Sequence, residues 1–174
     1  MAEKYVYTTA DGVLYQLDPS DMSEVATFST ENLLRLIAHG RDGYVYVCSD
    51  TVINKVDPAS MEKKDAFSGF NSIDDMEFDN NGYLYVADFE TIYKIDPASM
   101  AEESHIVTSD GIEAISSDGS NLYVAHNADY LIDKRKLSDM SLIATNSDLS
   151  LRPLNLEVGV DGFVYVVTKK VTLF

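Results

Sequence analysis

The segment that organises this chain is VYVCSDTVINKVDPASMEKKDAF (45–67), because its phrase DPASM (Asp57–Met61) recurs at Asp96–Met100. Weaker copies are DPSDM at Asp18–Met22 and KLSDM at Lys136–Met140. The four methionines that end these phrases are separated by 39, 39 and 40 residues. A period of about 40 residues indicates an array of similar supersecondary units, each of which buries an apolar face against its neighbour.

Each period contains the same succession of four short runs separated by turns. An aliphatic first run leads into an Asp-Gly or Asn-Gly turn, whose glycine supplies the positive φ of a tight hairpin. The second run is the most apolar and does not alternate with polar residues, so both of its faces are expected to be buried. Its copies are KYVYT (4–8), YVYVC (44–48), YLYVA (83–87), LYVA (122–125) and FVYVV (163–167).

The third and fourth runs complete the unit. The third run ends at the DPxxM phrase, whose proline cannot continue a hydrogen-bonded ladder. The fourth run, such as KKDAFS (63–68), is polar and irregular, as outer edge strands usually are. No segment has convincing helical periodicity. We therefore predict an all-β fold, a β-propeller of four-stranded antiparallel blades, in one domain over residues 1–174. The expected repeats are 1–30, 31–69, 70–109, 110–148 and 149–174.

The first and last blades are expected to be incomplete. The chain begins with a second run and ends with the third run KVTLF (170–174). A five-bladed ring could close on itself, or an open arc could be completed by another chain or by further sequence, because exposed strand edges invite pairing. We favour the single ring. The repeated methionine is expected to fold back from its turn and fill the gap between blades.

The composition restricts the kinds of partner. The chain has 174 residues, of which 45% are hydrophobic, and 13 basic against 29 acidic residues give a formal charge of −16. Such a field repels phosphate, so neither nucleic acid nor a membrane is expected as a partner. No membrane-spanning stretch or secretory signal is visible. A cytoplasmic location is expected, and a virion component is an alternative.

The repeats resemble those of pyrroloquinoline-quinone-type and YVTN-type propellers in GVLYQLDPSDMSEVATF (12–28) and in residues 45–67. Both families have an apolar strand, a short turn and a strand that ends in Leu-Asp followed by Pro or Thr. The resemblance extends over the whole chain and implies the propeller architecture. The quinoprotein dehydrogenases of the first family use a tryptophan docking motif. This chain has no tryptophan, so no cofactor is expected.

A polar ring is the candidate ligand site. In a propeller the first strand of each blade lines a central channel, and four polar residues lie near the starts of these strands: Arg35, Asp74, Glu113 and Asn155. Such a ring can hold water, a cation or a small polar ligand, or can simply solvate the channel mouth. The loop carboxylates lack the D-x-D-x-D-G spacing of a calcium loop, so no metal site is predicted. His126 is expected to be a solvated loop residue, and it alone is placed for a general base.

The functional prediction is reached by elimination, because no catalytic residue, cofactor motif or metal site is predicted. We expect a non-enzymatic, rigid interaction or assembly module that binds a protein partner or itself through open blade edges. One alternative is a small-ligand or lactone-type hydrolase with a polar or metal site at the channel. Another is a carbohydrate-binding or receptor-binding propeller with aromatic side chains exposed on its rim, for which the candidates are Phe70, Phe89 and Tyr130.

Overall fold

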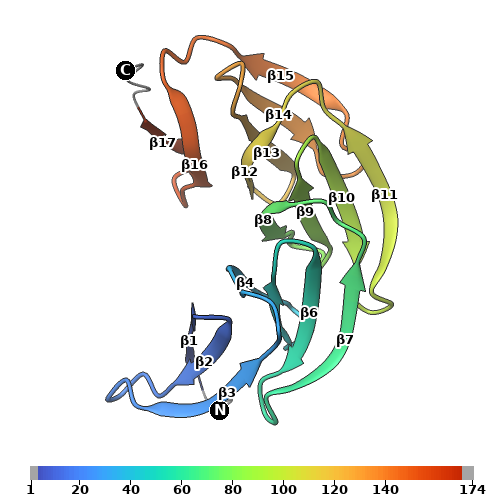
Figure 1. Ribbon diagram of the computed structural model, residues 1–174. Coiled ribbons are helices and arrows are strands. Elements are labelled where there is room, and N and C mark those ends of the chain that lie inside the picture. The colour runs from blue at the N-terminus through green and yellow to red at the C-terminus, as the bar shows by residue number, and fades with distance from the viewer. Residues whose placement is uncertain (1–3, 170–174) are drawn as a thin grey trace. The chain divides into compact units, whose positions relative to one another are not determined.

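The computed structural model describes residues 4–169, which contain seventeen β-strands and no helix (Figure 1). The strands form five sheets in which neighbours follow one another in chain order. The predicted all-β fold is therefore confirmed. The predicted last run, KVTLF (170–174), lies outside the described residues.

The strands group into two compact units. The N-terminal unit holds the described residues through Ile73 together with Pro97–Ala101, and the C-terminal unit holds Asp74–Asp96 together with those from Glu102 onward. Whether they form one domain, and whether a ring closes, stay predictions.

The N-terminal unit contains the first two sheets, which are named here by their order in the chain. Sheet 1 consists of β1 (Val6–Ala10), β2 (Val13–Leu17) and β3 (Glu24–Ser29). Sheet 2 consists of β4 (Leu36–His39), β5 (Val45–Cys48), β6 (Val52–Asp57) and β7 (Glu62–Ser68). Sheet 1 thus begins with the second run of a repeat and has three strands, as the phase of the repeat predicts.

The C-terminal unit contains the other three sheets, apart from a few residues at their margins. Sheet 3 consists of β8 (Ile73–Phe78), β9 (Leu84–Asp88), β10 (Thr91–Asp96) and β11 (Ala101–Val107). Sheet 4 consists of β12 (Ile112–Ser117), β13 (Asn121–His126), β14 (Ile132–Lys136) and β15 (Leu142–Asn146). Sheet 5 consists of β16 (Arg152–Val158) and β17 (Val164–Lys169).

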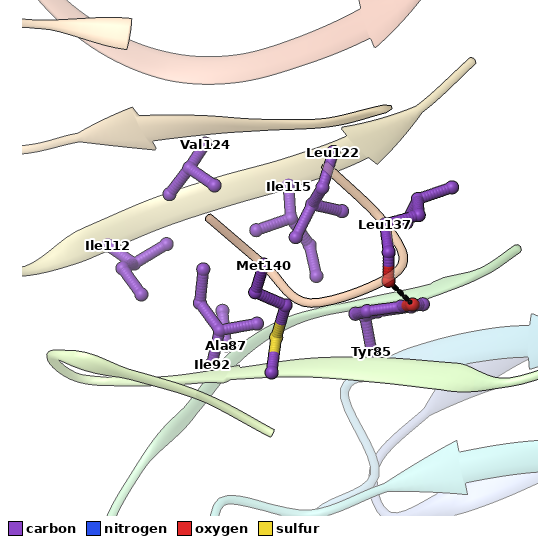
Figure 2. Close-up of a cluster of buried hydrophobic side chains, with 9 residues drawn as sticks. All are labelled: Tyr85, Ala87, Ile92, Ile112, Ile115, Leu122, Val124, Leu137 and Met140. Carbon is purple, nitrogen blue, oxygen red and sulfur yellow. Dashed lines mark hydrogen bonds between the residues drawn. The ribbon is translucent and has the colours of Figure 1, made fainter. Parts of the chain in front are cut away.

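The hydrophobic core of each unit lies between consecutive sheets. In the N-terminal unit, Leu14 and Phe28 of sheet 1 cluster with Val45 and Val47 of sheet 2. In the C-terminal unit, the cluster in Figure 2 joins sheets 3 and 4; its members are Tyr85, Ala87, Ile92, Ile112, Ile115, Leu122, Val124, Leu137 and Met140. Each sheet therefore buries its apolar residues against the next one, as the repeat predicts.

The second strands are buried on both faces only where sheets flank them. All residues of β5 and β9 are buried, as their continuous apolar runs predict. The same prediction is wrong for β1, which alternates between exposed and half-buried residues, and for β17, which is mostly exposed. These strands belong to the first and last sheets, and within its own unit neither has a further sheet against its exposed face.

The DPxxM turns share one backbone conformation. The methionine has a positive φ in every copy: 60° at Met22, 51° at Met61, 48° at Met100 and 55° at Met140. The Met61 amide donates to the Asp57 carbonyl at 2.8 Å, and the Ala59 amide donates to Asp57 Oδ1 at 2.9 Å. A left-handed conformation costs a residue with a Cβ roughly 1–2 kcal/mol, so the turn needs compensation from elsewhere.

That compensation comes from packing against the preceding sheet. Met61 belongs to the core cluster between sheets 1 and 2, and Met140 to the cluster between sheets 3 and 4. Met100 is buried too. The predicted role of the methionine as a plug is therefore confirmed for Met61 and Met140. It is wrong for Met22, which is 56% exposed, because sheet 1 is the first sheet of the described residues.

Candidate functional site

The four residues predicted to line a channel lie at or beside the first strands of their sheets. Arg35 directly precedes β4 and forms an ion pair with Asp50. Asp74 lies in β8, where its Oδ2 accepts the Phe89 amide at 3.0 Å.

The other two lie in β12 and β16. Glu113 Oε2 accepts Arg152 Nη2 at 2.5 Å, whereas Asn155 is exposed in β16. Arg35, Asp74 and Glu113 thus contact turns or neighbouring strands through their charged groups. A role of the four residues in binding a ligand stays a prediction.

A different set of carboxylates on the first strands connects neighbouring sheets. Asp75 Oδ2 accepts the Ile115 amide at 2.8 Å, and Glu77 Oε1 accepts the Ser117 amide at 3.2 Å. Both amides belong to β12, the edge strand of sheet 4. Side chains of β8 thus satisfy donors for which an edge strand has no ladder partner. The next pair of sheets has a similar contact, in which Ser116 Oγ accepts the Val158 amide at 3.3 Å.

The pKa values of Asp75 and Glu77 are raised above those of ordinary carboxylates. Burial raises the pKa of Asp75, and the nearby charges of Glu157 and Asp74 raise it further. Burial likewise raises the pKa of Glu77 to about 7, with smaller contributions from Glu157 and Asp75. Glu77 therefore gains or loses a proton close to neutral pH.

Sequence reasoning missed the roles of Glu77 and Glu157. The available signal was strand alternation, which places Asp75 and Glu77 on one face of β8. Within residues 4–169 no group of three or more His, Cys, Asp or Glu side chains is arranged to hold a metal ion.

His126 is a buried structural residue, so its prediction as a solvated loop residue placed for a general base is wrong. It ends β13 and its side chain is 2% exposed. Its Nδ1 lies 3.3 Å from the Asp110 carbonyl oxygen, and its Nε2 lies 3.4 Å from Asp133 Oδ2. Asp133 also accepts Arg135 Nη2 at 2.7 Å and Thr145 Oγ1 at 2.6 Å. A histidine enclosed in this way does not reach a substrate.

A recurrent hydrogen bond links the last three DPxxM-type turns to the sheet before each of them. The acceptor is the carbonyl of the second residue of the phrase. Gln16 Nε2 donates to Pro58 at 2.9 Å, and Lys55 Nζ donates to Pro97 at 2.7 Å. Between sheets 3 and 4 the Tyr85 hydroxyl donates to Leu137 at 2.8 Å (Figure 2). The phrase that reveals the repeat is thus also the element that fastens consecutive sheets.

Sheet 5 presents an uncovered apolar face. Phe163, Tyr165 and Val167 are 68%, 56% and 60% exposed, and their spacing of two residues puts them on one side of the strand. At the equivalent positions of sheet 3, Tyr85 and Ala87 are fully buried beneath sheet 4. The face that packs against sheet 4 in sheet 3 therefore has an exposed counterpart in sheet 5.

The predicted rim aromatics differ in exposure. Phe70 is 6% exposed and packs against Phe67 with ring centroids 5.2 Å apart, so its prediction as an exposed rim residue is wrong. Phe89 is exposed and has a positive φ of 55°. Tyr130 is half-buried in a similar backbone conformation, with φ 53°.

The N-terminal unit also contains a cavity of about 840 Å³. Tyr5, Tyr7, Gln16, His39 and Pro58 are among its lining residues. Gln16 occupies the repeat position of Lys55, whose longer side chain lies over the Tyr44 ring at 4.4 Å and pairs with Asp42 at 2.7 Å. The shorter amide at position 16 leaves this space less filled.

Comparisons with known proteins identify the fold and no family. No family model matches the chain, and no curated protein matches its sequence. Residues 4–169 contain no helix long and apolar enough to cross a membrane. A chain in a solved structure titled "Crystal Structure of Mitotic Checkpoint Complex" is similar, with a TM-score of 0.83 and 13% sequence identity.

The alignment with that structure covers 94% of this chain and 56% of the other chain, so this chain spans little more than half of its length. Similar folds occur in 1126 chains, and a fold this widespread does not specify an activity. The chain has a β-propeller fold of antiparallel sheets, and within residues 4–169 the three central sheets have four strands each, the first has three and the last has two.

Proposed function

We propose that this chain is a rigid, non-enzymatic interaction or assembly module that binds a protein through the exposed face of sheet 5. The observation that supports this most directly is the row formed by Phe163, Tyr165 and Val167. Contiguous exposed apolar side chains commonly mark interaction sites, and aromatic residues contribute most to such interfaces. The similar solved structure is itself a complex by its title, which agrees with a role in assembly.

The proposed rigidity rests on the contacts between sheets. Side-chain donors bind the turns of the following sheet at Pro58, Pro97 and Leu137. Side-chain acceptors on β8 bind the first strand of sheet 4. The contacts join residues that are 40 to 52 apart in sequence, so the array resists local opening and presents its terminal face with little loss of entropy.

The other proposed functions have weaker support. A lactone-type hydrolase would use Glu113, but this carboxylate pairs with Arg152. A carbohydrate or receptor binder would use exposed aromatics, of which Phe89 is the best placed. We also propose that the chain is related to the pyrroloquinoline-quinone-type or YVTN-type propellers. We propose that it acts in the cytoplasm or as a virion component. The charge of −16 supports protein partners over nucleic acid or membranes.

Site-specific photocrosslinking in the source cells tests this function. A photoreactive amino acid at position 165 is expected to give covalent adducts with protein. The matched control is position 142, because Leu142 is also exposed in the C-terminal unit but lies on the outer strand β15. Equal adduct yields at the two positions would overturn the proposed interaction surface.

A further inference from the structure

Two complementary halves form the joint between sheets 1 and 2 and the joint between sheets 3 and 4. One half is a face of the earlier sheet, such as Tyr85 and Ala87 in sheet 3. The other half is the opposite face of the later sheet together with its DPxxM methionine, such as Leu122 and Met140 in sheet 4. We call these the receiving half and the inserting half. In the N-terminal unit, Leu14 and Phe28 receive Val45 and Met61 in the same way.

Sheet 5 has a receiving half that nothing fills within its unit. Tyr165 corresponds to Tyr85, and Val167 corresponds to Ala87, by their positions in the second strand of the repeat. Tyr165 and Val167 are more than half exposed, whereas Tyr85 and Ala87 are fully buried. This receiving half is apolar and accessible.

Sheet 1 has an inserting half that packs against no other sheet within its unit. Val6 and Met22 correspond to the buried Val45 and Met61, yet both are exposed. The turn is already formed, because the Met22 amide donates to the Asp18 carbonyl at 2.7 Å and Met22 has the positive φ of the other copies. This inserting half therefore needs no rearrangement to pack.

We infer that two copies of this chain associate head to tail, with sheet 1 of one copy packed on sheet 5 of the next. Met22 then lies against Tyr165 and Val167, as Met140 lies within the cluster of Figure 2. The inference rests on the proposed function, because it names the partner of the sheet 5 face. A second copy is the occupant because a DPxxM methionine fills the joint between sheets 1 and 2 and the joint between sheets 3 and 4, and an exposed copy of this methionine is on sheet 1.

The geometry and the charge both predict how the assembly behaves. Because the contact is heterologous, successive copies either close into a ring or continue into a longer chain. Each copy carries a formal charge of −16, so repulsion opposes association and added salt weakens that repulsion. We expect oligomers that grow with protein concentration and with ionic strength.

Sedimentation equilibrium and native mass spectrometry of the purified chain test this inference. Wild-type protein should form a concentration-dependent series of dimers and larger oligomers. Met22→Glu and Tyr165→Glu should each yield monomers, because each removes one half of the joint. Leu142→Glu is the control and should associate like the wild type. Circular dichroism and thermal unfolding establish that every variant is folded.

Mixing the two monomeric variants is the decisive measurement. The Met22→Glu variant keeps its receiving half and the Tyr165→Glu variant keeps its inserting half, so the mixture should give one-to-one heterodimers and nothing larger. A wild-type chain that stays monomeric at every concentration would overturn the inference. So would a mixture without heterodimers.

The crosslinking experiment separates failure of this inference from failure of the proposed function. An adduct at position 165 with residues of sheet 1 in a second copy supports both. An adduct only with a different protein overturns self-association and leaves the interaction function standing. Loss of selective adducts at position 165 overturns both.

Discussion

The hydroxyl of Tyr85 donates a hydrogen bond of 2.8 Å to the backbone carbonyl of Leu137, 52 residues further along the chain. The bond fastens the second strand of sheet 3 to the turn of sheet 4 and is buried. Burial raises the pKa of Tyr85, so the hydroxyl keeps its proton and remains a donor. It is one of three bonds in the described chain that attach a DPxxM turn to the preceding sheet.

Tyr85→Phe should destabilise the chain by about 1–2 kcal/mol, because the Leu137 carbonyl loses its buried donor. Urea unfolding followed by circular dichroism measures this change. Tyr165→Phe is the matched control, since the Tyr165 hydroxyl binds Asp161 at an exposed site. An equal effect at the two positions would contradict the assignment of Tyr85 to the joint.

Met140→Ala should cost about 2–4 kcal/mol of unfolding free energy, because it opens a cavity in the cluster between sheets 3 and 4. Met22→Ala removes the same atoms from an exposed turn and should change stability by less than about 0.5 kcal/mol. The comparison needs protein dilute enough to be monomeric. Similar losses for both variants would show that Met22 is already covered in the free chain.

Stability should fall as the pH rises from the ordinary glutamate value of 4.5 to about 7, the value to which burial raises the pKa of Glu77. Over this interval the folded chain holds a proton that the unfolded chain has released, so deprotonation favours unfolding. Thermal unfolding as a function of pH measures the slope. Glu77→Gln should flatten it, whereas Glu24→Gln, on the outer strand β3, should leave it unchanged. An unaltered slope in the Glu77 variant would remove Glu77 as its origin.

Asp133→Ala should destabilise the chain by about 3–5 kcal/mol, because it leaves the Arg135 charge without its buried partner. Asp139→Ala is the control, since Asp139 is exposed and accepts only local hydrogen bonds from Ser141. Chemical denaturation of both variants checks the prediction. A small loss of unfolding free energy for Asp133→Ala would contradict the prediction, because it would mean that water solvates the Arg135 guanidinium in the folded chain.

The sequence was sufficient for features that depend on local pattern. The apolar runs, the Asp-Gly turns and the DPxxM phrase predicted strands close to the observed ones; β5 (Val45–Cys48), for example, lies within the predicted run 44–48. The buried roles of Met61 and Met140 also followed from repetition, because equivalent residues in successive sheets meet equivalent neighbours.

Features that depend on a neighbour's presence or position could not be obtained in this way. Met22 ends a phrase similar to that of Met61, and it is exposed because no sheet precedes sheet 1 within its unit. His126 looked like a loop residue because the burial of its side chain depends on Asp110 and Asp133, which come from other segments. Burial is the main cause of the raised pKa of Glu77, and a smaller contribution comes from Glu157, which lies 80 residues away in sequence.

The left-handed backbone conformation of the DPxxM methionine affects the first sheet differently from the later ones. At Met61 and Met140 an unfavourable backbone angle is offset by a side chain that fills a space, so a glycine there would relax the turn but leave a hole. At Met22 there is no hole to leave, and a glycine would make the free chain more stable. Residue 22 is thus the position where the needs of an isolated molecule and of a stacked one diverge.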